Sequence, residues 1–269
     1  MLAAASFFDL TEFSHKKLFQ GADYVWDGLV NLKSYMNSLD YSSFNAFRHK
    51  EAEDGIPLKH HLIYYQDRLQ SGKDCAITWG DVGKGKLAVM RDGQLLAGAS
   101  VIMAGAVLLG QEIQLGQGVL IESGALIKSP AVIGDYTEIR QGAYVRGYCL
   151  TGKRCVIGHA TEVKHSIFLN DAKAGHFAYL GDSILGNDAN LGAGTKFANL
   201  RFLPGNVQVR TDKGLLDTGL RKLGAILGDR VQTGCNSVTN PGTLIGPEGI
   251  LMPNTTANSG FHTPREIIR

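Results

Sequence analysis

A period of six residues runs through the sequence from Ala97 to Val145, and it constrains the fold more than any other feature. This period fits neither an α-helix, which repeats every ~3.6 residues, nor a strand, which alternates every two. It is typical of a hexapeptide β-helix, in which each six supplies one short strand and one corner. From the second repeat on, the first position is always aliphatic: Met103, Leu109, Leu115, Ile121, Ile127, Ile133, Ile139 and Val145.

The aliphatic row predicts a continuous core. Three sixes make one coil of about 18 residues, and stacked coils bury the aliphatic residues against one another. A sandwich of ordinary short strands is the alternative, but it does not require one unbroken register. We therefore predict an all-β parallel solenoid. Glycine often follows the aliphatic residue and permits the backbone angles of the corners: Gly98, Gly110, Gly116 and Gly134.

The charge and the cysteines narrow the possible partners and the compartment. The 269-residue chain has a net charge of +2, which gives no electrostatic reason to expect nucleic acid or a membrane as partner. The first residues lack the basic region of a signal peptide, and no apolar run reaches about 18 residues. We therefore expect a cytoplasmic chain. Its cysteines lack C-x-x-C spacing and are interpreted as reduced, buried thiols: Cys75, Cys149, Cys155 and Cys235.

Residues 1–70 lack the sixfold period and are predicted to form a mainly helical N-terminal region. Apolar residues at helical spacing indicate an amphipathic helix over about Ala22–Leu39, preceded by a shorter one over about Leu10–Phe19. We interpret the region as a cap, or as a contact with a partner or a trimer mate, because the apolar end of a solenoid needs covering. Four aromatic residues near its end are interpreted as packing residues in preference to site residues: His60, His61, Tyr64 and Tyr65.

Residues 71–96 are predicted to be a linker or a short β segment. They contain G-D-V-G-K-G-K from Gly80 to Lys86, which nearly matches the phosphate-binding loop G-x-x-x-x-G-K-[ST]. Leu87 stands where that loop needs a hydroxyl, and no strand-then-helix context is evident. We therefore interpret the stretch as a turn.

The predicted solenoid spans residues 97–252. Its register is interrupted at about residues 200–221, where we expect a hairpin-like arm that leaves the prism. Residues 253–269 are polar and are predicted to form a peripheral tail.

One block of the solenoid carries polar residues that a structural coil does not need. They form the patterns E-x-K at Glu162–Lys164, K-A-x-H-x-x-Y-x-G-D at Lys173–Asp182 and N-x-G-A-G-T at Asn190–Thr195, followed by Asn199. With this spacing the block resembles the acetyltransferase domain of the bifunctional UDP-N-acetylglucosamine pyrophosphorylase / glucosamine-1-phosphate N-acetyltransferase family. The resemblance covers roughly Ile133 to Gly246.

The resemblance implies a left-handed parallel β-helix, a homotrimer, and active sites between neighbouring subunits. It also implies acetyl transfer from acetyl-CoA to the amine of an amino-sugar 1-phosphate in nucleotide-sugar biosynthesis. His176 matches the family's catalytic base. The implied substrate-binding residues are Arg146, Lys164 and Lys222 for the phosphate, and Tyr179 and Asn190 for the sugar. The implied acetyl-CoA contacts are Ala193, Asn199 and Cys235, the last at a serine position of the family.

Elementary chemistry agrees with these roles. Arg146 and Lys164 are separated by one coil of about 18 residues. They should therefore stack on one face of the prism, where they could clamp a phosphate; two solvated charges are the alternative. A sugar amine must lose a proton before it attacks a thioester, and histidine, with a pKa of about 6.5, is the natural base. A lone histidine is more often structural, but His176 lies within the matched motif. Asp182 could orient a neighbour or satisfy buried backbone, and we favour the second.

The sequence departs from the family pattern at Leu200, in place of an aromatic residue, and at Pro253, in place of an alanine. The arm and its flanks look like the archaeal-type branch of bifunctional sugar-1-phosphate nucleotidylyltransferase/acetyltransferases. Because the alignment crosses the arm, Arg221 is an alternative to Lys222 as phosphate ligand. Residues 1–96 are too short for the family's nucleotidyltransferase domain and lack its glycine-rich loop, so we expect no pyrophosphorylase activity.

We therefore predict a trimeric, cytoplasmic, acyl-CoA-dependent N-acetyltransferase for an amino-sugar 1-phosphate. No metal is expected, because His159 and His165 lack partners at the spacing of metal ligands. Two alternatives stay open. One is a module that binds a sugar phosphate or sugar nucleotide without transfer, and the other is a trimer whose helical N-terminus recruits a separate nucleotidyltransferase.

Overall fold

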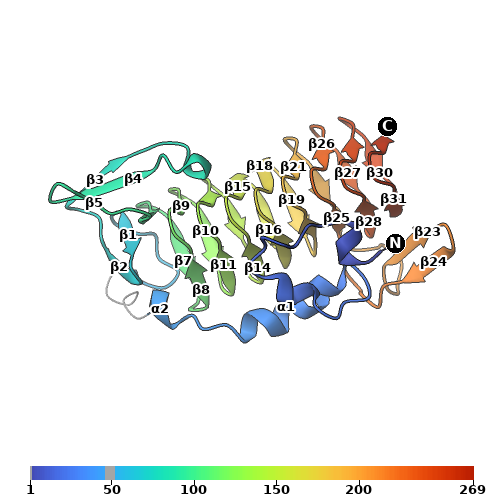
Figure 1. Ribbon diagram of the computed structural model, residues 1–269, viewed down its shortest axis with the longest axis horizontal. Coiled ribbons are helices and arrows are strands. Elements are labelled where there is room, and N and C mark those ends of the chain that lie inside the picture. Colours follow the sequence, from blue (N-terminus) through green and yellow to red (C-terminus); the bar gives the residue numbers. More distant parts are fainter. Residues whose placement is uncertain (1, 46–51) are drawn as a thin grey trace.

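The computed structural model describes residues 2–45 and 52–269, most of which form a parallel β-solenoid (Figure 1). Short strands follow one another around a three-sided prism, and each pairs in parallel with strands of the neighbouring coils. The left-handed parallel β-helix of hexapeptide repeats predicted from the sequence is confirmed. The chain passes in turn through three sheets, here called sheets 1, 2 and 3, and then begins the next coil.

The coil strands of the three sheets are two to four residues long. Sheet 1 contains β6 (Ser100–Ile102), β9 (Leu120–Ile121), β12 (Glu138–Ile139), β15 (Val156–His159), β18 (Lys173–His176), β21 (Asn190–Leu191), β26 (Gln232–Thr233), β29 (Ile250–Leu251) and β32 (Ile267–Ile268). Sheet 2 contains β7 (Val107–Leu109), β10 (Leu126–Lys128), β13 (Tyr144–Val145), β16 (Glu162–Lys164), β19 (Tyr179–Gly181), β22 (Lys196–Phe197), β27 (Val238–Thr239) and β30 (Thr256–Ala257). Sheet 3 contains β8 (Ile113–Leu115), β11 (Ala131–Ile133), β14 (Cys149–Thr151), β17 (Ser166–Phe168), β20 (Ile184–Leu185), β25 (Ala225–Leu227), β28 (Thr243–Ile245) and β31 (Gly260–His262).

The aliphatic row fills the prism from Leu115 onwards, in agreement with the prediction. Before that point the prediction is wrong by one residue, because Ile102 and Leu108 face the core in place of their successors, Met103 and Leu109. The register gives the reason. Ile102 pairs with Ile121, a step that is one residue longer than the regular coil.

The coils also become shorter where the sixfold pattern fades. Val145 pairs with Val163, which is the step of a regular coil, whereas the step from Ile157 to its partner Ala174 is one residue shorter. Such a shorter coil shifts every later inward position by one. The polar residue at the fading point, Thr151, is buried, and its hydroxyl accepts a 2.9 Å hydrogen bond from the amide of Gly134.

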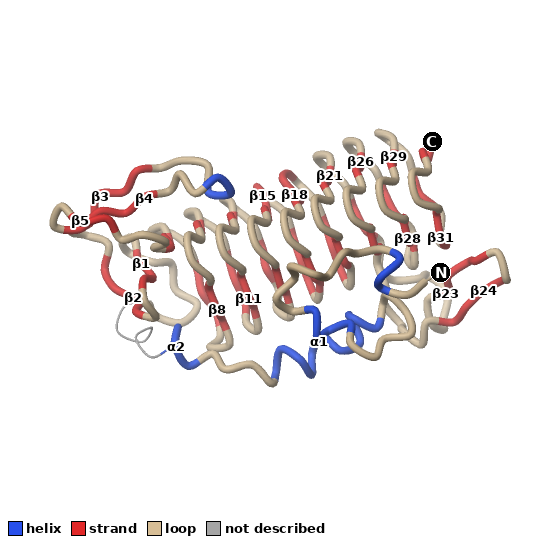
Figure 2. Tube along the Cα trace, in the orientation of Figure 1, coloured by secondary structure: helices blue, strands red, loops and turns tan. Residues whose placement is uncertain are grey.

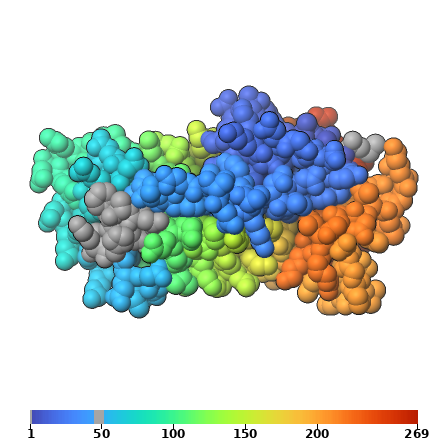
Figure 3. Space-filling model, turned by 90° about the horizontal axis from the view of Figure 1, so that it is seen from below, coloured from blue at the N-terminus to red at the C-terminus, as the bar shows by residue number. Residues whose placement is uncertain are grey.

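Residues 2–39, here called the strap, run along the outer face of sheet 3, and Figure 3 shows this blue segment lying across one long side of the molecule. The strap contains η1 (Ala4–Ser6), η2 (Lys16–Phe19) and α1 (Asp27–Asn37). Its aromatic and aliphatic side chains form one buried cluster with the apolar outer face of the sheet. The residues that sheet 3 and its following corners contribute include Val132, Leu150, Ile167, Leu169, Ile184, Ile226 and Leu244.

The strap corrects two expectations about the N-terminal region. The shorter helix over Leu10–Phe19 is reduced to the 3-10 turn η2, and the longer one begins and ends inside the predicted Ala22–Leu39. The strap also covers a side of the prism, not its end. It is tied there to Asp229, whose carboxylate accepts a 2.8 Å hydrogen bond from the amide of Asp9.

The N-terminal end of the prism is closed by the residues that follow the strap. These are α2 (Ser42–Asn45) and the hairpin of β1 (Leu62–Tyr65) and β2 (Arg68–Ser71), and β1 pairs antiparallel with β6. Phe44, Leu58 and Tyr64 belong to the main core cluster. Packing therefore accounts for Tyr64, as predicted.

Residues 71–96 form a small antiparallel sheet against the outer side of sheet 1. Its strands are β3 (Cys75–Thr78), β4 (Ala88–Arg91) and β5 (Gln94–Leu95). The Gly80–Lys86 stretch is a turn around η3 (Val82–Lys84), in which the Asp81 side chain accepts a 3.1 Å hydrogen bond from the amide of Lys84. The interpretation of this stretch as a turn agrees with the structure.

The arm leaves the prism between β22 and β25 and contains the hairpin of β23 (Gln208–Thr211) and β24 (Gly214–Asp217) (Figure 2). The prediction of a peripheral tail over residues 253–269 is wrong, because β30, β31 and β32 complete the last coil. Ala257 and Ile268 are buried inside that coil. An alanine at an inward position made the repeat hard to recognise.

The prediction of four buried thiols is correct for two of them. Cys149 and Cys155 are buried, and burial raises the pKa of each thiol to about 12. Cys75 is only half-buried, and Cys235 is exposed at a corner. Across residues 2–45 and 52–269, no helix is long and apolar enough to cross a membrane.

Candidate functional site

The two predicted phosphate ligands Arg146 and Lys164 lie on the outer side of sheet 2. Arg146 directly follows β13 and Lys164 ends β16. Because Val145 pairs with Val163, the two cations stand one coil apart on one face, as expected from their spacing. Lys222 lies further along the prism, at the base of the arm. Its backbone forms an isolated antiparallel β-bridge with Leu200.

Arg146 and Lys164 are each paired with a carboxylate. Arg146 Nη1 lies 2.7 Å from Glu162 Oε1, and the guanidinium stands 5.8 Å from the centre of the Tyr144 ring. Lys164 Nζ lies 3.7 Å from Asp182 Oδ2. The Arg146 pair is partly exposed, so it adds little to stability. An incoming phosphate could therefore compete for the guanidinium at small cost.

Tyr179 stands one coil beyond Glu162 on the same face. Burial raises the pKa of its hydroxyl, and the carboxylates of Glu162 and Asp182 raise it further against the opposing charge of Arg146. The hydroxyl therefore stays protonated and can donate a hydrogen bond to a ligand oxygen.

Gly181 is a residue of this site that we did not single out from the sequence. A Cβ at this position would lie 2.8 Å from the Tyr179 hydroxyl and would collide with the side-chain nitrogen of Asn199. Glycine thus leaves the space in which both side chains approach the sheet. This gives a physical reason for the glycine in the Y-x-G-D pattern.

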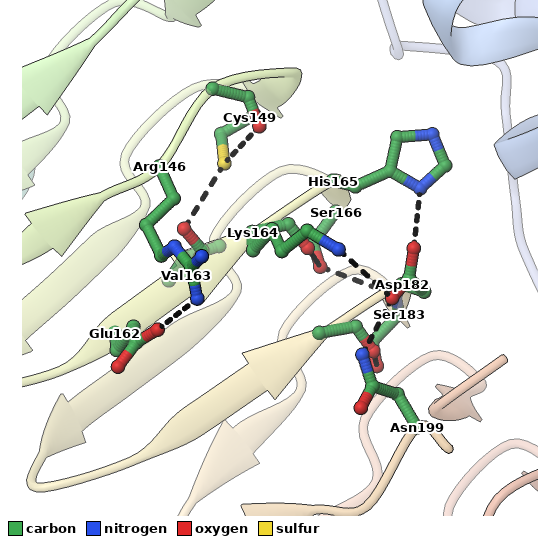
Figure 4. Close-up of polar contacts among 12 residues, drawn as sticks. Arg146, Cys149, Glu162, Val163, Lys164, His165, Ser166, Asp182, Ser183 and Asn199 are labelled. Carbon is green, nitrogen blue, oxygen red and sulfur yellow. Dashed lines mark hydrogen bonds and ion pairs between the residues drawn. The ribbon is translucent and has the colours of Figure 1, made fainter. Parts of the chain in front are cut away.

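Asp182 orients its neighbours, so the preference for a role with buried backbone was wrong. Its Oδ1 accepts a 2.9 Å hydrogen bond from His165 Nδ1, and its Oδ2 accepts one of 2.6 Å from Asn199 Nδ2 (Figure 4). Burial disfavours the charged carboxylate. The hydrogen bond and charge of His165, with the contributions of Lys164 and Asn199, outweigh burial and hold the pKa of Asp182 below its usual value.

This lowered pKa predicts how stability depends on pH. A carboxylate whose pKa is lower in the folded than in the unfolded state stabilises the protein above the unfolded pKa, and this contribution is lost as the pH falls through the folded pKa. We therefore expect wild type to exceed Asp182→Asn in free energy of unfolding most strongly near neutral pH. The difference should shrink as the pH drops below about 4. Denaturant titrations at pH 7 and pH 3 measure it, and equal differences at both would contradict the assignment.

His176 lies at the opposite edge of sheet 2, where β18 of sheet 1 ends, and its side chain is exposed. The amide of Gly194 donates a 3.0 Å hydrogen bond to the His176 carbonyl, which places Ala193 in the next coil at the same corner. The amide of Asn236 in turn donates a 2.8 Å hydrogen bond to the Ala193 carbonyl. Exposed Cys235 is therefore one coil further on.

The predicted site residues other than Asn190 thus fall into two groups, one at each edge of sheet 2. The backbone from 177 to 181 lies between His176 and the corner of Asp182 and spans at most about 16 Å, at ~3.3 Å per residue. Tyr179 lies within this span and reaches the first group through its hydroxyl, which lies beside Asn199. Within the described residues, no hydrogen bond or ion pair joins the two groups. The first group, here called the cation group, contains Arg146, Lys164, Tyr179, Asn199 and Lys222. The second, here called the histidine group, contains His176, Ala193 and Cys235. Asn190 belongs to neither group, because it begins β21 in sheet 1, where it pairs with Lys173.

A search of residues 2–45 and 52–269 gives no cluster of three or more histidine, cysteine, aspartate or glutamate side chains that could hold a metal ion. The two other histidines of the motif block are engaged locally. His159 Nδ1 lies 2.8 Å from the carbonyl oxygen of Gln141, and His165 bonds to Asp182.

Comparison with known proteins finds similarity over part of the chain. The family model described as GMPPB C-terminal domain matches residues 127–248. A bifunctional sugar-1-phosphate nucleotidylyltransferase/acetyltransferase of Sulfurisphaera tokodaii is 39% identical over 116 residues, which are 43% of this chain and 29% of that protein. The resemblance inferred from the motifs is confirmed. A bifunctional protein GlmU of Methanocaldococcus jannaschii is also 39% identical, over 39% of this chain and 25% of its own length.

The matches therefore span less than a third of the length of these relatives. Their archaeal origin agrees with the resemblance to the archaeal-type branch. Among solved structures, a UDP-N-acetylglucosamine acyltransferase of Francisella novicida is similar with a TM-score of 0.40 and 13% identity. That similarity covers 61% of this chain and 62% of the other.

Proposed function

We propose that this chain is an acyl-CoA-dependent N-acetyltransferase that acts on an amino-sugar 1-phosphate similar to glucosamine 1-phosphate. The observation that carries the proposal is the stacked pair Arg146 and Lys164 on sheet 2, with His176 at the edge of the same sheet. All three lie within residues 127–248, which match the family model described as GMPPB C-terminal domain, and one relative is a bifunctional sugar-1-phosphate nucleotidylyltransferase/acetyltransferase.

In this proposal the cation group holds the sugar phosphate. Arg146 and Lys164 bind the phosphate from neighbouring coils, and Lys222 approaches it from the base of the arm, with Arg221 as the alternative. The Tyr179 hydroxyl contacts the sugar, and Asn190 does so from sheet 1. Arginine suits this task because its planar guanidinium can bind a phosphate through two parallel hydrogen bonds.

The histidine group carries the transfer. His176 takes a proton from the amine, whose nitrogen then attacks the thioester carbonyl carbon of acetyl-CoA and forms the C–N bond. Collapse of the tetrahedral intermediate breaks the C–S bond, and the leaving thiolate takes a proton back from His176. The Gly194 amide already donates to the His176 carbonyl, so we assign stabilisation of the oxyanion to the amide of Ala193. Asn199 and Cys235 are assigned to contacts with the acetyl-CoA arm.

A homotrimer with sites at the subunit boundaries would complete such a site. The two groups of one chain stand at opposite edges of sheet 2, so a neighbouring chain could bring one group opposite the other. Sheet 3 is covered by the strap, which leaves sheets 1 and 2 to face a neighbour. We propose this trimer and a cytoplasmic location together with the activity.

A thiol-release assay tests the proposal. Acetyl-CoA is supplied with glucosamine 1-phosphate, galactosamine 1-phosphate or glucosamine 6-phosphate, and free CoA is measured. The proposal expects CoA release that depends on a 1-phosphate and on a free amine, with N-acetylglucosamine 1-phosphate as an inactive control. No release with any amino-sugar 1-phosphate would reject it.

Replacing Arg146 with glutamine tests the phosphate clamp. Loss of a bidentate phosphate contact should raise the KM for the sugar phosphate roughly tenfold and leave the KM for acetyl-CoA unchanged. Arg154→Gln is the matched control, because Arg154 is also paired with a carboxylate one coil away (Nη2 to Asp171 Oδ2, 2.6 Å) but lies at a different corner. Equal effects of the two substitutions would contradict the assignment.

A module that binds sugar phosphate without transfer is the second candidate. It is favoured by Pro253, which replaces a family alanine and packs against Gly234 beside Cys235 in the histidine group. Thermal stabilisation by glucosamine 1-phosphate without thiol release would select it. Recruitment of a nucleotidyltransferase by the helical N-terminus is less well supported, because most apolar side chains of the strap are buried against sheet 3.

A further inference from the structure

We propose that His165 is a positioning residue of the cation group, which acts through Asp182 to fix the side chains of Asn199 and Lys164. The inference rests on the proposed function, because it names a residue that prepares the same site for the sugar phosphate. His165 was considered from the sequence only as a possible metal ligand. Its role follows from the corner that it occupies.

Three successive coils place His165, Asp182 and Asn199 at one corner. The residues are 17 positions apart, and both hydrogen bonds cross between neighbouring coils. Asp182 stands in the middle and uses its two oxygens differently. Oδ1 is held by His165 Nδ1, whereas Oδ2 accepts the Asn199 amide and lies 3.7 Å from Lys164 Nζ. His165 therefore fixes the carboxylate that both site residues contact, as Figure 4 shows.

The bond to Asp182 is the polar interaction that accounts for an imidazole here. Its other ring nitrogen, Nε2, is buried and has no hydrogen-bond partner among the described residues. A buried nitrogen without a hydrogen-bond partner lowers the free energy of unfolding. An apolar side chain at this corner would avoid that loss. The hydrogen bond to Asp182 is therefore the reason for a histidine at this position, because it orients that carboxylate.

Tyr148 packs against the imidazole, and the strap contacts Tyr148. The Tyr148 ring meets the His165 ring edge-on at 6.3 Å, and the Tyr148 hydroxyl donates a 3.3 Å hydrogen bond to Asn37 Oδ1 at the end of α1. Lys33 of the same helix lies 5.5 Å from the centre of the Tyr148 ring. The rotamer of His165 is thus fixed by packing, which a positioning residue requires.

Loss of the imidazole should change the position of Lys164. Without His165, the largely buried Asp182 carboxylate keeps its charge but loses the donor on Oδ1. The Lys164 ammonium is the nearest cation and should close the 3.7 Å gap to Asp182. It would then be drawn away from the phosphate. Through Lys164, the effect should appear in the affinity for the sugar phosphate.

The test compares His165→Ala with His165→Asn. His165 has a left-handed backbone (φ 47°), which asparagine tolerates well, and the asparagine amide can still donate to Asp182. His165→Ala should raise the KM and the Kd for glucosamine 1-phosphate roughly tenfold, the scale of one charge-assisted hydrogen bond. His165→Asn should restore most of the loss. Unchanged constants in His165→Ala, or equal losses in both variants, would overturn the proposal.

Two measurements separate this inference from the proposed function. If wild type binds glucosamine 1-phosphate but releases no CoA, the transferase proposal fails and the Kd series still judges His165. If His165→Ala does not fold, wild type labelled with 15N-histidine provides the answer. The His165 ring should show a protonated Nδ1, and its resonances should shift when glucosamine 1-phosphate is added. Wild type that binds no sugar phosphate, or a His165 signal that does not respond, would overturn the inference.

Discussion

Replacing His176 with alanine should lower kcat for acetyl transfer by about 10²- to 10⁴-fold, the range that a positioned general base contributes. The KM for the sugar phosphate should change little, because the cation group lies at the other edge of sheet 2. The imidazole is exposed at the end of β18, so its removal leaves no cavity in the core. Steady-state kinetics with both substrates varied would measure the split, and an unchanged kcat would reject the assignment.

His159 provides the matched control for this experiment. It occupies the same corner one coil earlier, since the register pairs it with His176. Its Nδ1 lies 2.8 Å from the Gln141 carbonyl oxygen, and we assign it no part in the reaction. His159→Ala should keep kcat within about threefold of wild type, a change of under ~1 kcal/mol in the barrier. Equal losses in both variants would indicate that the corner needs its shape and not one imidazole base.

The sixfold period predicted the architecture because it reports directly on which side chains enter the prism. The strap lies outside this period, and its position could not be predicted. The helical spacing of its apolar residues shows that an apolar face exists, but not which surface of the prism that face covers. A sign of the receiving surface was nevertheless present. Val132 lies between the inward residues Ala131 and Ile133, and Leu150 repeats this outward apolar position one coil later. An apolar row on the outside of a coil indicates a covered side.

The positions of the site residues could be predicted where the coils have the regular length of the sixfold period. They could not be predicted where the coils become shorter. The regular coil length expected from the sixfold period correctly stacked Arg146 on Lys164. The corner of His165, Asp182 and Asn199 was missed because the coils there have 17 residues, and only that spacing aligns the three. The length of a coil depends on the corner geometry, which a single sequence expresses weakly. A search for polar residues at both spacings would have found this cluster.

Replacing Gly158 with alanine should disrupt the stacking of the coils that carry the site. Gly158 lies in β15, and a Cβ there would overlap the carbonyl oxygen of Gly175 in β18, so backbone would have to move. We expect a loss of about 3 kcal/mol or more in the free energy of unfolding. For a chain of this size that corresponds to a Tm lower by roughly 6–12 °C.

Gly175→Ala is the control for this substitution, and it isolates the cause. A Cβ at Gly175 meets no atom within 4 Å, and neither glycine has a left-handed backbone. The two substitutions therefore add the same methyl group to neighbouring strands, and only one meets an obstacle. Because a solenoid is held together by contacts between adjacent coils, the damage should concentrate at the β15–β18 interface. Hydrogen exchange should then be fastest at the amides of these two strands in Gly158→Ala, and a Tm equal to that of Gly175→Ala would contradict the argument.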